Sequence, residues 1–327
     1  MKRFAALILA LVMACSLLAG CGSKTNDDSN TPSDGWAPKG AVTVICPYGA
    51  GGGQDICARI FAKYAEKYCG VSFVIDNITG GSATIGNTAI ANAKTDGQTL
   101  GIFTNLAYYD ATITEGVAYT TDSFNQLINM CGDGTIIVAR KSLGVTDMKG
   151  LMDLAASQKV IWGGPEFAGQ TLPRMSLEAL TGITFDHMIF DGGSSTLAAI
   201  LGNNCDVTAV FPSEYASVAD EDGIVAIAYT GEERLESYPD LPTVQESGYD
   251  VSFYMLRSIC APAGVSEEVA KYYTEKFEQV LNDPDFQKDM KEAGFSLYPL
   301  VGDATYDYMM EVYNAQIDNV KKAASQG

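Results

Sequence analysis

The hydrophobic positions of this chain change repeatedly from the two-residue period of a strand to the period of a helix. A β-branched run at residues 42–46 breaks at Pro47 into a glycine-rich turn. Apolar residues then recur at helical spacing, at Ile56, Ile60, Phe61, Tyr64 and Tyr68, which we expect to face inward. Alternation of strand and helix is typical of α/β proteins with parallel strands, so we expect that fold class.

The same patterns predict further strands and helices. Strands are expected at residues 71–75, 136–139, 159–164, 206–211 and 224–229, and a helix at residues 145–157. The carboxyl-terminal part should be helical, because Ser266 can cap one helix and Asp283 with Pro284 can begin a second. A last helix is predicted with an apolar face made of Tyr306, Met310, Tyr313, Ile317 and Val320.

The chain contains three glycine-rich turns, and the first two follow predicted strands. They read Y-G-A-G-G-G-Q at residues 48–54, N-I-T-G-G-S-A at 77–83 and F-D-G-G-S-S at 190–195. Glycine has no Cβ, so backbone N–H groups in such a turn can approach an anion beside the positive end of a helix. Because such turns open at the same edge of a parallel sheet, we expect the first two to converge on one ligand. The alternative is that these glycines only make tight turns.

Motifs for nucleotide, metal and catalytic chemistry are missing from the sequence. No Gly-Lys dipeptide occurs for a phosphate loop, and a dinucleotide fingerprint counted from Gly49 would place Gln54 where a third glycine is required. His187 is the only histidine, no G-x-S-x-G elbow is present, and the eight cysteines show no C-x-x-C spacing. We therefore expect no catalytic residue, no metal site and no cofactor.

Some polar and aromatic residues have a structural interpretation beside a functional one. Asp55 and Arg59 stand four apart on a predicted helix, which favours an ion pair over ligand contact. Trp162 can either line a cleft or fill a core. The cysteines are expected as small buried residues, although a disulfide between Cys57 and Cys69 stays open.

The amino terminus resembles a bacterial lipoprotein signal. Lys2 and Arg3 precede an apolar run at residues 4–18, which is too short to span a bilayer and leads into Leu-Ala-Gly-Cys. We expect residues 1–20 to be a signal peptide, Cys21 to carry the lipid and residues 21–39 to be a flexible tether. An ordinary secretory peptide is the alternative. Either predicts an extracytoplasmic protein, and the lipid would anchor it at the outer face of the cytoplasmic membrane or in the periplasm.

The charge of the chain excludes some partners. Loss of Lys2 and Arg3 with the signal would leave 19 basic against 40 acidic residues, a net charge of about −21. Nucleic acids and anionic membrane surfaces are poor partners for such a protein. The residues after the tether are enough for two α/β domains of ordinary size.

Six motifs in order along the chain carry a resemblance to a known family. They are V-T-V-I-C-P-Y-G-A-G-G-G-Q-D-x-x-A-R, V-I-D-N-x-x-G, T-D-G-Q-T-L-G, F-D-G-G-S-S-T-L, Y-P-D-L-P-T-V-Q-E-S-G-Y and C-A-P-A-G-V. Together they resemble the substrate-binding proteins of tripartite tricarboxylate transporters, the Bug family. The resemblance extends from about residue 40 to the end of the chain.

The resemblance implies a periplasmic-binding-protein-like fold of type II, with two α/β domains and a ligand cleft between them. One domain would comprise residues 40–137 plus 254–327 and the other residues 138–253. The implied function is a monomeric receptor that captures a small carboxylate and delivers it to integral-membrane transporter subunits. Two alternatives stay open: a ligand sensor for a membrane signalling partner, and an extracytoplasmic hydrolase or lyase.

The resemblance also implies the ligand-binding residues. The first two turns would hold the carboxylate through Tyr48, Gly49, Ala50, Gly51, Gly52, Gly53, Gln54, Gly80, Gly81, Ser82 and Ala83. The second domain would contribute Phe167, Ala168, Gly169, Gln170, Thr171, Asp191, Gly192, Gly193 and Ser194.

The chain departs from the pattern of the family in ways that concern the ligand. In the second turn Ile78 and Thr79 stand where the family usually has Arg and Pro, so one cation is lost. In the third turn the acidic Asp191 stands where a basic or aromatic residue is usual. We therefore expect a monocarboxylate, or an acid carrying an amine near Asp191, rather than a dicarboxylate.

Overall fold

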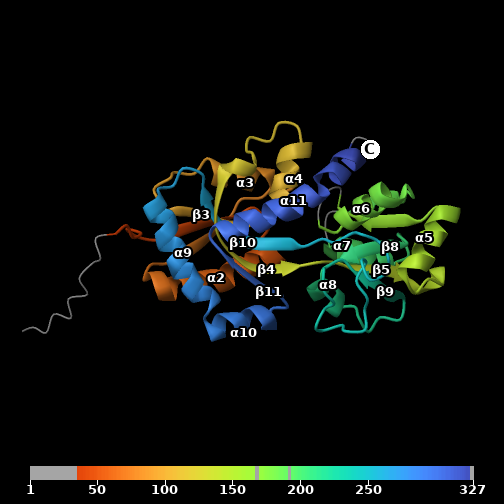
Figure 1. Cartoon of the computed structure of the whole chain (residues 1–327). Helices are drawn as coiled ribbons and strands as arrows, with labels where there is room; N and C mark the ends of the chain where they lie inside the picture. The colour runs from red at the N-terminus through yellow and green to blue at the C-terminus, as the bar shows by residue number, and fades with distance from the viewer. Residues whose placement is uncertain (1–34, 166–168, 191–192, 325–327) are drawn as a thin grey trace, which may run out of the picture. The chain divides into compact units, whose positions relative to one another are not determined.

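The computed structural model describes residues 35–165, 169–190 and 193–324. The predicted signal peptide, Cys21 and all but the last residues of the predicted tether lie outside this part. The described chain forms two β-sheets with helices packed on them (Figure 1). Within this part, no helix combines the length and apolar character needed to cross a bilayer.

The first sheet has six strands in the order β11-β4-β10-β3-β1-β2. Its strands are β1 (Val42–Cys46), β2 (Phe73–Asn77), β3 (Thr99–Thr104), β4 (Phe124–Asp133), β10 (Met255–Pro262) and β11 (Leu297–Val301). The helices that belong with it are α2 (Gly53–Cys69), α3 (Thr84–Ala91), α4 (Leu106–Ile113), α9 (Glu267–Leu281), α10 (Pro284–Glu292) and α11 (Asp303–Ala324). Strands β2, β1 and β3 are parallel, with Val44 opposite Ile75 on one side and Leu100 on the other.

The second sheet has five strands in the order β7-β6-β8-β5-β9. Its strands are β5 (Ile136–Arg140), β6 (Ile161–Gly164), β7 (Asp186–Ile189), β8 (Val207–Val210) and β9 (Ile224–Tyr229). Helices α5 (Met148–Ser157), α6 (Leu172–Thr181), α7 (Gly193–Leu201) and α8 (Pro212–Ala216) connect them, and short 3-10 turns occupy Thr121–Ser123 and Lys141–Leu143.

The chain crosses between the sheets twice, once from β4 to β5 and once from β9 to β10. Helix α11 contacts both parts, and Figure 1 shows it running from the first sheet toward α6. One hydrogen bond in this contact joins Ser176 Oγ to Gln316 Oε1 at 2.8 Å. The pairing of β5 places residues 136 and 137 in the second sheet, so a division after residue 137 would cut that strand.

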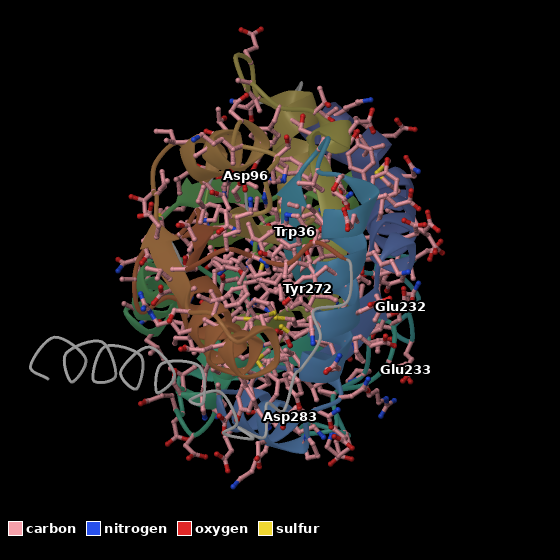
Figure 2. The ribbon with its side chains drawn as sticks, turned by 90° about the vertical axis from the view of Figure 1, so that its left-hand side faces the viewer. Trp36, Asp96, Glu232, Glu233, Tyr272 and Asp283 are labelled. Carbon is pink, nitrogen blue, oxygen red and sulfur yellow. The ribbon has the colours of Figure 1, made fainter. Side chains whose placement is uncertain are left out.

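Aromatic residues fill the cores of both parts. Phe61 of α2 meets Phe277 of α9 edge to face, with ring centroids 4.8 Å apart. Trp36 packs against Tyr272 at 5.4 Å, and Figure 2 shows the two close together. Trp162 is fully buried and lies 5.2 Å from Phe185, which assigns it to the core of the second sheet rather than to a cleft.

Several local predictions are confirmed by the structure. Ser266 caps α9 by accepting a hydrogen bond from the Val269 N–H, and Asp283 caps α10, which begins at Pro284. Helix α5 starts three residues later than predicted, because Asp147 caps it by accepting from the Gly150 N–H. The described cysteines are free, and Cys57 lies beside Cys131 with their sulfur atoms 4.0 Å apart rather than paired with Cys69.

One predicted core position was wrong. Ile56 is 41% exposed, whereas Phe61 and Tyr64 of the same helix are buried. The buried face of the first turn carries the small residues Cys57 and Ala58 instead, which let α2 approach the sheet closely. Ile56 is left to line a cavity at the amino-terminal end of the helix.

Candidate functional site

A cavity of about 710 Å³ is lined by residues that belong with both sheets. Such a volume suits a small organic ligand. The sequence-predicted residues that line it are Tyr48, Gly49, Ala50, Gly52, Gly53, Gln54, Ser82, Ala83, Gly169 and Gln170. The first and second glycine turns are thus brought to the same cavity, as the topology of the parallel strands predicts.

Other predicted site residues have different positions. Gly51, Gly80, Gly81 and Thr171 are described but do not line the cavity. Gly193 and Ser194 form the beginning of α7. Phe167, Ala168, Asp191 and Gly192 lie outside the described residues.

The amino terminus of α2 presents open backbone donors to the cavity. Gly52 is the N-cap residue, and no side chain caps the helix. Gly53 and Gln54 follow it at the first two helical positions, and their N–H groups bond to none of the described residues. Two such donors beside the positive end of a 17-residue helix favour an anion.

Gly51 and Gly52 do not present free N–H groups, contrary to the expectation for the whole turn. The Gly51 N–H donates to Asp55 Oδ2 at 2.9 Å, and the Gly52 N–H donates to the Gly49 carbonyl at 3.2 Å. Gly51 has a φ of 79°, in the left-handed region that glycine adopts at little cost. The turn therefore folds back on itself at Gly51 and Gly52, while the donors of Gly53 and Gln54 stay open.

A buried carboxylate holds this turn in place. Asp55 is 2% exposed, and Arg59 Nε donates to its Oδ2 at 2.8 Å, which confirms the predicted ion pair. Asn77 Nδ2 donates both to Asp55 Oδ1 and to the Tyr48 carbonyl, each at 2.9 Å. The hydrogen bond from Arg59 lowers the pKa of Asp55 to about 2. The carboxylate is thus a positioning group that ties the end of β2 to the first turn.

The side chain of Gln54 is buried at the edge of the cavity without a partner. The residue is 6% exposed, and neither its amide nitrogen nor its amide oxygen bonds to a described residue. Leaving an amide buried and unpaired costs about 1–3 kcal/mol, so such groups are rare in folded proteins. A polar group of this kind beside an open helix terminus indicates a place where a ligand completes the hydrogen bonding.

Two acidic side chains also line the cavity, and the sequence did not single them out. Asp110 of α4 is 7% exposed, and its carboxylate has no hydrogen bond or ion pair with the described residues. Burial raises the pKa of Asp110 to about 7. Glu214 of α8 accepts from the Phe211 N–H at 2.9 Å, and burial raises its pKa as well.

The cavity also contains one buried guanidinium, which has an ion-pair partner but whose buried Nε has no partner among the described residues. Arg257 of β10 is 3% exposed and donates from Nη1 to Asp133 Oδ2 at 2.5 Å. Its guanidinium carbon lies 5.5 Å from the ring centroid of Phe211 and 5.1 Å from that of Phe295. Nothing in the sequence pointed to this residue, because its partner is 124 positions away in the chain.

His187 and the cysteines do not contribute to the cavity. His187 lies on β7 outside the lining, and burial lowers its pKa. Among the described residues, no three His, Cys, Asp or Glu side chains come together in a group that could hold a metal ion.

Comparisons with known proteins agree with this geometry. The family model described as the tripartite tricarboxylate transporter family receptor matches residues 57–321. A protein from Agrobacterium vitis, encoded in the ttuE-ttuC′ intergenic region, is 24% identical over 304 residues, which is 88% of this chain and 85% of that protein.

Two solved structures illustrate the similarity in fold. MatC from Rhodopseudomonas palustris with bound malate has a TM-score of 0.73 at 20% identity, covering 86% of this chain and 99% of its own. An R. palustris protein with adipate has a TM-score of 0.74 at 22% identity, covering 88% of this chain and 98% of its own. The fold is therefore that of a periplasmic binding protein with two α/β domains.

Proposed function

The chain belongs to the receptor family of tripartite tricarboxylate transporters, and on this premise we propose that it captures a small organic acid in the cavity and delivers it to the membrane subunits of such a transporter. Members of this family are substrate-binding proteins rather than enzymes. The observation that carries the proposal is the buried, unpaired amide of Gln54 beside the open N–H groups of α2.

The chemistry of this end of the cavity supports a carboxylate as the bound group. A carboxylate oxygen can accept from the N–H groups of Gly53 and Gln54 and from the amide nitrogen of Gln54. Two relatives in fold are bound to malate and to adipate, which are both carboxylates. We assign the second turn, through Ser82 and Ala83, to the same end of the ligand, and Gly169 and Gln170 to contacts from the second domain.

Native mass spectrometry of the protein without its first 34 residues should detect a co-purified small acid, and calorimetry should show stoichiometric binding of the same acid unchanged. In this assay we expect Gly53→Val to weaken binding about tenfold or more, because a branched side chain crowds the two open donors. Folding should be unaffected, since a Cβ at Gly53 meets no heavy atom within 4 Å. Gly52 is a less suitable position for this substitution, because a Cβ there would lie 3.2 Å from the Gly49 carbonyl oxygen.

Gly223→Val is the matched control. Gly223 is exposed, has equally open surroundings and does not line the cavity. Thermal melts of both variants should match that of the wild type. If Gly53→Val folds and binds as tightly as the wild type, the helix terminus is not the anion site.

We further propose that the receptor is anchored to the membrane through a lipid on Cys21. Support comes from the sequence, in which an apolar run ends at Leu-Ala-Gly-Cys and a polar segment follows. Cys21→Ala should leave an unprocessed precursor or release the protein into the soluble fraction, as fractionation and mass spectrometry of the amino terminus would report. Correct processing with continued retention in the membrane fraction would rule out this anchor.

A further inference from the structure

The charge balance of the cavity points to a more specific class of ligand than a small acid. Resting on the proposed function, we propose that the ligand is a zwitterion with one carboxylate and one protonated amine, whose carboxylate binds at Gln54 and whose amine binds at Asp110. A dicarboxylate is disfavoured by the same arrangement. The inference follows from three features of the lining.

The first feature is the supply of hydrogen-bond donors. Gln54 is 6% exposed, and its amide nitrogen has no partner among the described residues, so it can serve one carboxylate together with the two open N–H groups of α2. These neutral donors suit a carboxylate without requiring a cation. These donors satisfy the hydrogen bonding of the carboxylate end of the ligand.

The second feature is the shortage of positive charge. Among the described lining residues, Arg257 is the single cation, and it is shared with the Asp133 carboxylate, although its buried Nε has no partner among these residues. The predicted second turn has Ile78 and Thr79 rather than a basic residue, so it adds no cation either. A second ligand carboxylate would therefore have to share this one cation with Asp133, which is less favourable than a counter-charge of its own.

The third feature is a buried acid in the lining that has no partner among the described residues. Asp110 is buried without a hydrogen bond or ion pair to any described residue, although it lines the cavity. Glu214 of α8 also lines the cavity, but it already accepts from the Phe211 N–H and has Arg257 as a nearby counter-charge. An ammonium group can donate to Asp110, whereas a ligand carboxylate would be repelled by the ionised Asp110. The ligand amine thus supplies the hydrogen-bond and ion-pair partner that Asp110 lacks among the described residues.

One competing arrangement uses the same residues. A protonated Asp110 could donate a hydrogen bond to a second carboxylate, which would make dicarboxylate binding stronger at low pH. The titratable groups that interact electrostatically with Asp110 are Tyr48 and Tyr119, while Glu214 and Arg257 line the same cavity. Tyr48 and Tyr119 have raised pKa values and stay neutral, so Asp110 decides the pH dependence. Zwitterion binding should instead strengthen as the pH rises from 5 to 8.

The test is calorimetry with acids of matched length. Succinate is compared with 4-aminobutyrate and butyrate, and adipate with 6-aminohexanoate and hexanoate; alanine and leucine represent acids with an adjacent amine. We expect an amine-bearing acid to bind about ten- to hundredfold more tightly than the dicarboxylate and the simple monocarboxylate of the same length. Asp110→Asn should reduce that preference, since it keeps the shape but removes the charge, and Glu214→Gln should reduce it less, because Glu214 already accepts from the Phe211 N–H.

Asp318→Asn is the control for these variants, because Asp318 is exposed on α11 and does not line the cavity. Tightest binding of a dicarboxylate, equal binding of amine-bearing and simple acids, or binding of the amine-bearing acid that weakens from pH 5 to 8 would each overturn the zwitterion inference and leave the receptor proposal standing. Failure of every acid to bind would instead refute the proposed function. The two proposals therefore fail in different ways.

Discussion

Replacing Gln54 with leucine is expected to weaken ligand binding about tenfold or more and, at the same time, to make the empty protein more stable. The loss of affinity follows because leucine cannot donate to the ligand carboxylate, and one hydrogen bond to a charged group is worth about 1.5–3 kcal/mol. The gain in stability follows because both amide atoms of Gln54 are buried without partners among the described residues. Leucine is apolar and slightly shorter, and it removes that cost, which is about 1–3 kcal/mol.

The opposite signs of the two effects make the experiment decisive. A substitution that merely damages the fold lowers both affinity and melting temperature. Gln54→Leu should instead lower the affinity and raise the melting temperature. Gln54→Glu serves as the second variant, because it keeps the size and polarity but places a negative charge where the ligand carboxylate binds. Calorimetry and thermal melts without ligand would check both. Wild-type affinity in Gln54→Leu would show that the amide does not contact the ligand.

The first turn could be predicted from sequence because its signals are local. Residues 42–54 contain a β-branched strand, a break at Pro47 and glycines that precede a helix. Each of these signals depends only on residues that are close in the sequence. The caps at Ser266 and Asp283 are equally local, and both are found as predicted. Ile56 was misplaced because a helical period alone does not say which apolar residue faces a sheet and which faces a cavity.

Strand β4 illustrates why other elements were missed. It contains Gln126 and Asn129, which interrupt the apolar run, and yet both are buried. Their amide groups are satisfied by distant partners: Gln126 Nε2 donates to Tyr108 Oη at 3.1 Å, and Asn129 Nδ2 donates to the Tyr298 carbonyl at 2.7 Å. Only the tertiary structure supplies these partners, so the sequence pattern cannot anticipate them.

The residues that decide the ligand class in our proposal were not predicted from the sequence, for a similar reason. Asp110 lies within Leu-Ala-Tyr-Tyr-Asp, where tyrosines indicate core packing and one acid suggests an exposed position. Its burial arises from the packing of α4 in the folded chain, and the pairing of Arg257 with Asp133 joins segments 124 residues apart. The sequence did indicate the loss of a cation, through Ile78 and Thr79, and left a monocarboxylate and an acid with an amine near Asp191 both open; Asp191 lies outside the described residues.

Asp110→Asn should stabilise the empty protein in a pH-dependent manner, with an effect that is largest above neutral pH. Burial raises the pKa of Asp110 from 3.8 to about 7, so between these values the folded protein keeps a proton that the unfolded chain has lost. The stability associated with the protonated acid is fully present below pH 3.8 and is lost as the pH rises to about 7. Asparagine does not titrate and avoids this loss. Three pKa units correspond to at most about 4 kcal/mol, and relaxation of the surroundings will reduce the observed gain.

Denaturant unfolding from pH 5 to 8.5 would measure this effect for wild type, Asp110→Asn and the exposed control Asp318→Asn. The difference between Asp110→Asn and wild type should grow up to about pH 7 and then level off, whereas Asp318→Asn should follow the wild type throughout. A constant difference would mean that Asp110 is not held protonated by burial. Adding the amine-bearing acid should remove part of the advantage of asparagine above pH 7, because the ligand ammonium stabilises ionised Asp110 in the wild type alone. A protein that keeps a destabilising acid in its cavity, and recovers the cost when a cationic group arrives, retains that acid for binding rather than for folding.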